Sequence, residues 1–595
     1  MCGIAGIYAY GAEAPPADRD ALQRMHDVLA PRGPDGEGIE ISTDGRLALA
    51  HRRLSIIDLS DAGRQPMSTP DGRYSVVFNG EIYNYRELRD ALAADGVRFV
   101  SNSDTEVLLH LYAKYGPEMT RLLRGMFAFA IWDGPRRGLF LARDPYGIKP
   151  LYFADDGRSF RFASQVRALA ACGGVDTSPE PAGHAGFYLW GYVPEPWTFY
   201  RGIRSLPSGG SLWVDISGRG EPRRWFDLSG TLREAAPAPF DQAALSDAIA
   251  DSVRHHFIAD VPVGVFLSAG LDSATMAAHA AAIEGQGLRT VTLGFDEFRG
   301  GPQVETPLAE AIARHCGTTH ETRWIGRADF EAESDRLFAA MDQPSIDGVN
   351  TYFVARATRA AGLKVAISGL GGDELFGGYS SFREVPRLVR ALSPFRCLPG
   401  LGKALRIVAA PVVRRLTSPK WAGVIEYGAR WGDAYILRRG LFMPWELPEV
   451  MDPDMAREGW RALDERARLA TAVEGLATAR LRLVALESSW YMRNQLLRDS
   501  DWAGMAHGLE IRVPLVDATL LQRIAPMLAG TNPPGKRAMA LTAPKRLPDA
   551  VLDRPKTGFS VPVREWLHGA EDRKGPLDRG YRGWARYVHA RATGS

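Results

Sequence analysis

The first half of the chain alternates short apolar runs with glycine, proline and aspartate, a pattern typical of β-strands joined by turns. The runs cover residues 3–8, 47–50, 74–78, 127–132 and 139–142. Helical spacing of apolar positions interrupts them at residues 18–29 and 87–94. Short strands at this spacing predict stacked antiparallel sheets with a few helices.

The second half has a different pattern. A buried-strand run at residues 261–267 is followed by a turn of small residues, Ser268 to Ser273, and then by a helical stretch. Further strand runs at 290–295 and 364–369 predict an open α/β sheet of parallel strands. We therefore expect a first domain at residues 1–228, a linker at 229–240, a second domain at 241–570 and a candidate mobile tail at 571–595.

Composition narrows the class of protein. With 595 residues, of which 45% are hydrophobic and 24% charged, the chain can build at least two ordinary soluble domains. Its 72 Lys and Arg against 70 Asp and Glu give a net charge of +2, and hence no whole-chain argument for nucleic acid or an anionic membrane. Four scattered cysteines suggest neither disulfides nor zinc. No uncharged stretch is long enough to span a bilayer, so we expect a cytoplasmic protein without membrane insertion.

Cys2 is the first candidate for chemistry. Removal of Met1 would leave a thiol nucleophile beside its own α-amine, which titrates near ~8 and can act as a base. Taken alone, a small residue at position 2 is as easily an accident of translation. The rest of the chain must decide between the two interpretations.

Polar clusters separate the strands of the first half, at residues 32–35, 51–56, 79–84 and 103–106. Their order behind an N-terminal cysteine resembles the class II glutamine amidotransferases. The resemblance implies an N-terminal-nucleophile fold of two packed antiparallel sheets, in which Cys2 attacks the side-chain amide of glutamine and releases ammonia. It extends to Gln165, where family members usually carry Glu.

The resemblance also implies a role for each polar residue. Asn79 and the backbone N–H of Gly80 would stabilise the oxyanion, Arg53 would hold the α-carboxylate of glutamine, and Glu81 and Asp104 its α-ammonium. Considered singly, Asn79-Gly80 could be a hairpin turn and Arg53 a surface ion pair.

The turn at Ser268 to Ser273 joins a strand to a helix, which makes an anion site because the first N–H groups of a helix are unpaired. It resembles the loop of the ATP pyrophosphatases, Ser-Gly-Gly-x-Asp-Ser, with Ala269 in place of the first glycine, a mild change if its φ is negative. Residues 368–379 resemble the second signature of the asparagine synthetases. The implied ATP site comprises Phe266, Leu267, Ser268, Gly270, Asp272, Ser273, Leu293, Gly369 and Asp373.

Two further assignments follow from this resemblance. Asp272 and Asp373 are hard oxygen ligands that suit Mg²⁺, and Lys556 matches the catalytic lysine of the family. The run at residues 505–517 is a strong match, within which we interpret His507, Glu510 and Arg512 as buried polar packing.

The two halves together imply one reaction cycle, with glutamine, ATP and a carboxylate acceptor as substrates. Ammonia from glutamine would amidate an acyl adenylate. Glucosamine-6-phosphate synthases and phosphoribosyl-pyrophosphate amidotransferases share only the first half. β-Lactam synthetases share both, but the intact glutaminase set from Cys2 to Asp104 argues against them. A catalytically inactive glutamine-binding or scaffold protein is the alternative of another class. Family members often form homodimers, a further expectation here.

The acceptor pocket is assigned to Asp347, Leu370 and Glu374. Asparagine synthetases usually carry Glu at the position of Leu370, and aspartate-specific relatives tend to have an Arg in the segment 343–350, where this chain has none. Asp347 would repel a second carboxylate. We therefore expect an acceptor other than aspartate. Plain asparagine synthesis is the alternative if this alignment is displaced by a few residues.

Overall fold

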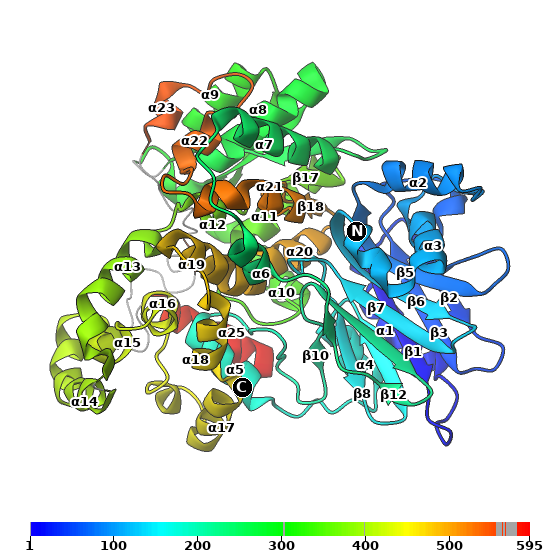
Figure 1. Ribbon diagram of the computed structural model, residues 1–595, viewed down its shortest axis with the longest axis horizontal. Coiled ribbons are helices and arrows are strands. Elements are labelled where there is room, and N and C mark those ends of the chain that lie inside the picture. Colours follow the sequence, from blue (N-terminus) through cyan, green and yellow to red (C-terminus); the bar gives the residue numbers. More distant parts are fainter. Residues whose placement is uncertain are drawn as a thin grey trace.

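The computed structural model describes residues 2–301, 304–397, 399–554, 562, 566 and 580–594. A sheet-rich N-terminal domain and a larger, mostly helical C-terminal domain lie side by side (Figure 1). None of the described helices is both long and apolar enough to cross a bilayer.

Two antiparallel sheets face each other in the N-terminal domain. The first has the order β10-β8-β9-β1-β3-β2 and the second β12-β11-β7-β6-β5-β4, with β13 paired to β11. Their bounds are β1 (Gly3–Ala9), β2 (Gly36–Ile41), β3 (Leu47–Arg53), β4 (Met67–Ser68), β5 (Tyr74–Ile82), β6 (Gly125–Asp133), β7 (Gly138–Arg143), β8 (Tyr152–Asp155), β9 (Ser159–Ala163), β10 (Arg204–Ser205), β11 (Gly210–Asp215), β12 (Gly218–Arg219) and β13 (Arg223–Arg224).

Apolar side chains fill the space between these sheets, among them Ile4, Leu49, Val77 and Phe162. On the outer faces, α1 (Arg19–Val28) and α4 (Val166–Cys172) pack on β1 and its neighbours, while α2 (Tyr85–Ala94) and α3 (Asp104–Tyr115) lie against β5. The predicted sandwich of two sheets between helices is confirmed.

The C-terminal domain is built on a five-stranded parallel sheet in the order β16-β15-β14-β17-β18. Its strands are β14 (Val263–Phe266), β15 (Arg289–Phe295), β16 (Thr319–Ile325), β17 (Val365–Ile367) and β18 (Glu510–Arg512). The helices that precede and connect these strands along the chain are α7 (Gln242–His256), α8 (Leu271–Glu284), α9 (Thr306–Cys316), α10 (Arg327–Ala340) and α11 (Val349–Ala360). The predicted open parallel sheet is therefore confirmed.

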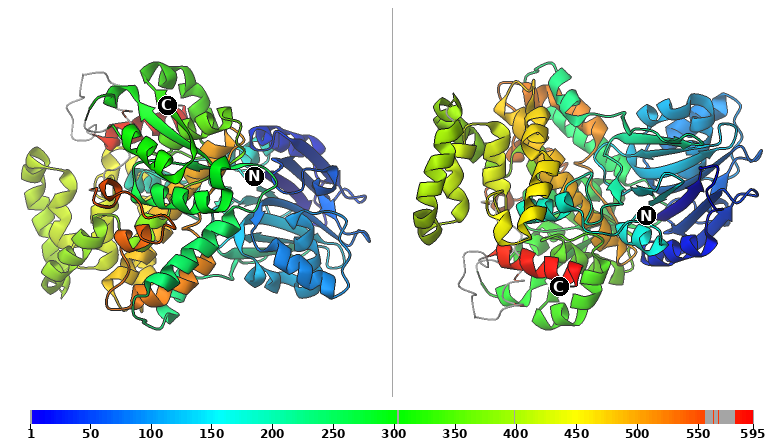
Figure 2. Two further views of the ribbon diagram at one scale, coloured as in Figure 1. Left: turned by 90° about the horizontal axis from the view of Figure 1, so that it is seen from above. Right: turned by 90° about the horizontal axis from the view of Figure 1, so that it is seen from below.

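A second group of helices extends away from the N-terminal domain (Figures 1 and 2). It includes α13 (Ser381–Leu392), α14 (Pro399–Leu416), α15 (Val424–Tyr427), α16 (Trp431–Arg439), α17 (Pro453–Leu463), α18 (Glu465–Val473) and α19 (Ala479–Leu486). A π-helical stretch at Glu487–Leu497 joins α19 to α20 (Arg498–Met505). Helices α21 (Ala518–Ala529), α22 (Lys536–Ala540) and α23 (Asp549–Leu552) follow.

Two segments differ from their expected character. Much of the predicted linker is α6 (Leu228–Glu234), whose Leu232 is buried and whose Ser229 Oγ donates to Ala472 O at 2.9 Å. The end of the proposed tail is α25 (Tyr581–Thr593), with Trp584 4% exposed. For residues 581–593 the expectation of a mobile tail was wrong, because an apolar helix face and a buried Arg582 anchor them.

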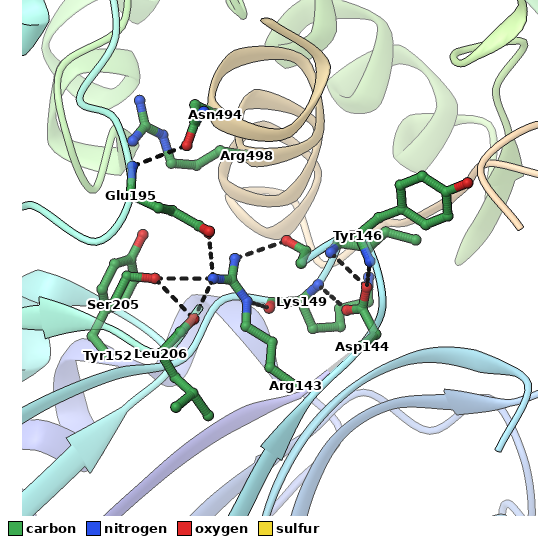
Figure 3. A network of polar contacts seen from close by, with 12 residues as sticks. Arg143, Asp144, Tyr146, Lys149, Tyr152, Glu195, Ser205, Leu206, Asn494 and Arg498 are labelled. Carbon is green, nitrogen blue, oxygen red and sulfur yellow. Dashed lines mark hydrogen bonds and ion pairs between the residues drawn. The ribbon is translucent and has the colours of Figure 1, made fainter. Parts of the chain in front are cut away.

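The two domains share a polar interface near Arg143 (Figure 3). Its guanidinium forms an ion pair with Glu195 and donates to Leu206 O at 2.8 Å. Glu195 N donates in turn to Asn494 Oδ1 of the π-helical stretch at 3.0 Å. Arg498 Nη1 also donates to Val193 O at 2.7 Å. The loop after α5 (Pro181–Trp190) is therefore fixed to both domains.

Candidate active sites

Cys2 precedes β1 and is held at the centre of the first sheet. Its backbone nitrogen, which removal of Met1 would turn into the α-amine, donates to Asn79 Oδ1 at 3.0 Å. The side chain is buried, and this burial raises the pKa of the Cys2 thiol above its usual value. A thiol in such surroundings needs a base at hand to become nucleophilic, which the adjacent amine can provide.

Asn79 and Gly80 lie within β5, paired with Ala128 and Phe127 of β6, so the hairpin-turn alternative is wrong. Gly80 has a φ of 156°, and a Cβ there would lie 2.1 Å from Met126 O. Only glycine fits this position. Asn79 is fully buried, and its Nδ2 has no hydrogen-bond partner in the described part of the chain. An oxyanion site needs a buried N–H donor that no other group already binds, and Asn79 Nδ2 meets this requirement.

Arg53 ends β3 and is directed inward. Nη1 donates to Ser60 O at 2.9 Å, and Nη2 donates to the carbonyl of Asp58. Gly63 gives it room, since a Cβ at that residue would lie 2.1 Å from Arg53 Nη2. Arg53 is therefore a buried, carbonyl-anchored side chain and the surface ion-pair alternative is wrong.

Glu81 and Asp104 are both buried beside this group. Burial raises the pKa of Asp104 to about 6, although its Oδ2 accepts from Ile82 N at 3.0 Å. Burial and then the charge of Glu510 raise the pKa of Glu81 well above its usual range. Buried carboxylates with raised pKa values favour the arrival of a cation.

Arg512 joins Glu81 to the second domain. Its Nη2 lies 3.4 Å from Glu81 Oε2 and its Nε 2.6 Å from Glu510 Oε1, so one guanidinium serves two buried carboxylates. Its Nη1 donates to the carbonyls of His256 and Ile258 at 2.8 and 2.7 Å. The sequence suggested only polar packing. The structure adds a direct contact with a residue assigned to glutamine.

Sequence reasoning also missed Arg32. Its Nε donates to Cys2 O at 3.0 Å, and its two terminal nitrogens bind Asp501 of α20 at 2.7 and 3.0 Å. Arg32 is 1% exposed. The partner lies 469 positions away, so no local pattern could have indicated this link between the nucleophile and the second domain.

The segment from Ser268 to Ser273 joins β14 to α8 as predicted, and its last three residues form the start of the helix. Ser268 Oγ and Ser273 Oγ are 2.8 Å apart, and Gly270 N donates to Ser268 Oγ at 3.2 Å. The described non-glycine residues with positive φ are Asp58, Arg137 and Asp464. Ala269 therefore has no positive φ and is the mild replacement. Leu293 is buried on β15, Leu267 is buried directly after β14, and Phe266 is partly exposed at the end of β14.

The glycines after β17 bring the second signature against this turn. A Cβ at Gly372 would lie 2.4 Å from Asp272 Oδ1, and one at Gly369 would lie 2.8 Å from Ser273 N. Asp272 and Asp373 meet at one cation, Lys536 Nζ, which lies 2.9 Å from Asp373 Oδ1 and forms an ion pair with Asp272.

Lys536 was not foreseen. Although burial opposes it, the two aspartates raise the pKa of Lys536 and keep the ammonium charged. An ammonium held by both carboxylates shows that they face a common point where positive charge is favourable, so the pair fits a hard divalent cation. No group of three or more metal-binding side chains occurs in the described residues. Lys556 lies outside the described residues.

The assigned acceptor residues lie in acidic surroundings. Asp347 is partly buried, and desolvation raises its pKa; its charge, after burial, helps raise the pKa of Asp499 to about 7. Glu374 accepts from Tyr379 OH at 2.8 Å, and burial and Asp373 raise its pKa to about 7. Leu370 packs on the main apolar core.

Tyr491 and Asp499 join this group, and neither was foreseen. Tyr491 lies within electrostatic range of both Asp347 and Glu374, and its ring contacts that of Tyr379. Nearby Arg439 is already bound by Glu487, with Nη2 and Oε2 2.8 Å apart.

A cysteine that heads two packed antiparallel sheets, followed by an anion loop on a parallel sheet, defines a two-domain glutamine amidotransferase with an ATP-dependent half. Residues 1–226 match the family described as "Glutamine amidotransferase domain", and residues 244–574 match "Asparagine synthase". The chain belongs to the glutamine-hydrolysing asparagine synthetase family. It is a carbon–nitrogen ligase of that type, with glutamine as the amide donor.

Similar proteins support this membership along nearly the whole chain. Asparagine synthetase [glutamine-hydrolyzing] 1 of Bacillus subtilis is 32% identical over 95% of this chain and 88% of its own length. A putative asparagine synthetase of Mycobacterium bovis is 34% identical over 96% of this chain and 89% of its own length. Asparagine synthetase B of Escherichia coli is 33% identical over 65% of this chain and 66% of its own length.

Proposed function

We propose that this enzyme adenylates a carboxylate other than aspartate with Mg²⁺-ATP and amidates it with ammonia released from glutamine at Cys2. The observation that supports the glutaminase half is the hydrogen bond from Cys2 N to Asn79 Oδ1, together with the buried Asn79 Nδ2 that has no partner in the described chain. The convergence of Asp272 and Asp373 on one cation supports the synthetase half. Both sites in one chain favour the complete cycle over an inactive scaffold protein.

In the glutaminase half, the α-amine of Cys2 takes the thiol proton as sulfur attacks the amide carbon of glutamine. Asn79 Nδ2 and Gly80 N–H donate to the oxyanion. The α-ammonium binds Glu81 and Asp104. There it competes for Glu81 with Arg512, which also binds Glu510. Arg53 binds the α-carboxylate. Departure of ammonia leaves a thioester that water hydrolyses to glutamate.

In the synthetase half, the acceptor carboxylate attacks the α-phosphorus of ATP, which releases pyrophosphate and forms an acyl adenylate. A Mg²⁺ ion on Asp272 and Asp373 would neutralise phosphate charge. Lys536 is positioned to move from the aspartates to the phosphates, and Lys556 is proposed to stabilise the developing oxyanion. Ammonia then attacks the acyl carbon, AMP leaves, and an amide results.

The class of acceptor is proposed from the charges of the residues in the acceptor pocket. Asp499 is buried and Asp347 partly buried, and the raised pKa of each is in keeping with a site where further negative charge is unfavourable. Arg439 is occupied by Glu487. A second carboxylate, as in aspartate, would be repelled by Asp347 and Asp499. An acceptor with a less acidic, partly apolar body fits better.

Two measurements test the proposal. Cys2→Ala should abolish amide formation from glutamine but keep synthesis from ammonium salts, and equal loss of both would refute the two-site scheme. Carboxylic acids are then compared by pyrophosphate release with ATP and ammonium. A kcat/KM for aspartate of about 10⁴ M⁻¹s⁻¹ or more, ordinary for a true substrate, would restore plain asparagine synthesis. No pyrophosphate release with any acid would favour the scaffold alternative.

A further inference from the structure

Positive and negative charges nearly balance over the whole chain, but they do not balance in residues 385–425. This stretch contains no aspartate or glutamate. Its cations are Arg387, Arg390, Arg396, Lys403, Arg406, Arg414, Arg415 and Lys420, so that eight positive charges stand in one stretch of a chain whose net charge is +2. A local excess of this kind creates a positive field over one part of the surface that the whole-chain sum hides.

The same stretch exposes a row of apolar side chains on α14. The exposed fractions are 41% for Leu401, 38% for Leu405, 78% for Val408, 59% for Val412 and 80% for Leu416. Their spacing of four, three, four and four residues places them on one face of the helix. A continuous exposed apolar row is unusual on a soluble monomer and marks an interaction surface.

A different face of α14 packs on the rest of the protein. Gly402 is buried against Glu426, where a Cβ would lie 2.7 Å from its Cα, and Arg406 Nε donates to Glu426 Oε2 at 2.6 Å. Helix α14 lies with α13 and α15 at the end of the molecule farthest from the N-terminal domain, in all three views (Figures 1 and 2). The surface is therefore remote from the glutaminase site and unobstructed by that domain.

We propose that α14 is a docking surface for an anionic lipid bilayer, on which the enzyme rests without crossing it. An apolar row next to lysines and arginines is the pattern of helices that lie in the membrane interface, since the row enters the acyl boundary while cations meet phosphate groups. Arg415 precedes Leu416 and flanks the row, so its long stem allows the charged end to reach head groups from the side of the helix.

A second copy of the chain fits this face less well. Helix α14 has no carboxylate, so two such helices in contact would bring like charges together without an ion pair to compensate. An anionic surface instead compensates every exposed cation. The charge pattern thus selects lipid over self-association.

Flotation of the full-length enzyme with vesicles tests this inference. We expect binding to phosphatidylcholine vesicles that contain phosphatidylglycerol to exceed binding to pure phosphatidylcholine by roughly tenfold or more, and to weaken with salt. Val408→Ser together with Leu416→Ser should reduce binding by roughly tenfold or more, since the buried apolar area is lost without a change of charge. Arg415→Gln tests the charged half in the same way.

Val100→Ser is the matched control, because Val100 is 77% exposed on the N-terminal domain and should leave vesicle binding unchanged. Thermal unfolding followed by circular dichroism reports that each variant is folded. Equal binding to neutral and anionic vesicles would overturn the proposal, as would full binding by the Val408 and Leu416 variant. A wild-type dimer that this variant converts to a monomer, without vesicle binding, would identify the face as a self-association surface instead.

Discussion

The side-chain amide of Asn79 is assigned two partners, the backbone nitrogen of Cys2 and the oxyanion of the substrate. Its Oδ1 accepts from Cys2 N at 3.0 Å, while Nδ2 is buried without a hydrogen-bond partner in the described chain. Such a donor costs about 1–3 kcal/mol when left unsatisfied. The transition-state oxyanion would satisfy it, so this cost is recovered only during catalysis.

Asn79→Asp separates these tasks, because the carboxylate keeps an acceptor for Cys2 N but loses the donor. We expect kcat for glutamine hydrolysis to fall by roughly 10²–10³, with a smaller change in KM, as measured by glutamate release. Asn84→Asp is the control, since Asn84 Nδ2 donates to Leu122 O at 2.9 Å outside the site. Similar losses in both variants would show a structural role for Asn79.

Asp373 should act on the other half of the reaction alone. Asp373→Asn removes one of two charges that hold Lys536 and, as proposed, Mg²⁺. We expect pyrophosphate release with ammonium to fall by roughly 10² or more, while glutamate release continues. Loss of glutamate release with normal pyrophosphate release would contradict the assignment of the two sites.

Residues whose chemistry depends on a local motif could be predicted. Asn79-Gly80 and Ser268 to Ser273 are each read from neighbouring positions. Arg32 and Lys536 could not be, because each gains its meaning from carboxylates 469 and 264 positions away, respectively. Long-range pairing of charges leaves no mark on the local sequence.

At the scale of elements, strands with clear alternation were predicted to within a few residues, as for 74–78 against β5 at Tyr74–Ile82. Strand β18 was missed, because its two charged residues, Glu510 and Arg512, are buried and paired, which reverses the usual alternation. The π-helical stretch at Glu487–Leu497 was missed as well, since apolar spacing does not distinguish it from an α-helix.

Helix α25 is an element whose importance the sequence did not indicate. Arg582 binds both carboxylate oxygens of Glu446 at 2.9 and 3.0 Å, and Glu446 is 0% exposed. Trp584 Nε1 donates to Ile346 O at 3.0 Å, next to Asp347 of the proposed acceptor pocket. Helix α25 therefore contacts the segment that leads into Asp347.

We expect a chain that ends before Gly580 to unfold at a lower temperature, because Glu446 is left as a buried charge without its partner, a loss of about 3–5 kcal/mol. Thermal unfolding of the two chains, followed by circular dichroism, measures the difference. Glu446→Gln in the shortened chain should restore part of the midpoint. An unchanged midpoint after truncation would mean that α25 contributes little to the fold.

At the scale of the whole molecule, the glutaminase and synthetase sites are joined by two arginines. Arg32 connects the carbonyl of Cys2 to Asp501. Arg512 contacts Glu81 through its side chain, while its backbone oxygen accepts from Ser368 N at 2.8 Å. Ser368 opens the glycine-rich signature that packs on Asp272. Arg512 thus contacts both Glu81 and the signature segment, and we expect a displacement of its side chain to affect both.

Glutamine should change the state of Arg512, because its α-ammonium competes with this guanidinium for Glu81. Linkage then requires that ATP and glutamine alter each other's affinity equally. We expect Mg²⁺-ATP to change the dissociation constant of glutamine by roughly fivefold or more in the Cys2→Ala protein, as measured by titration calorimetry. Arg512→Lys keeps the charge but loses the forked guanidinium that spans both carboxylates. In this variant the dissociation constants of glutamine with and without Mg²⁺-ATP should become nearly equal.

Arg124→Lys provides the matched control for this last prediction. Arg124 also crosses between the domains, with Nε 2.8 Å from Asp517 and Nη1 2.9 Å from Asp251, but it touches neither site. Its substitution should weaken the interface while the effect of ATP on glutamine binding persists. If both lysine variants lose that effect, the coupling resides in the interface as a whole. If neither does, or the wild-type chain shows none, Arg512 does not carry it, and the two sites communicate only through the ammonia that passes between them.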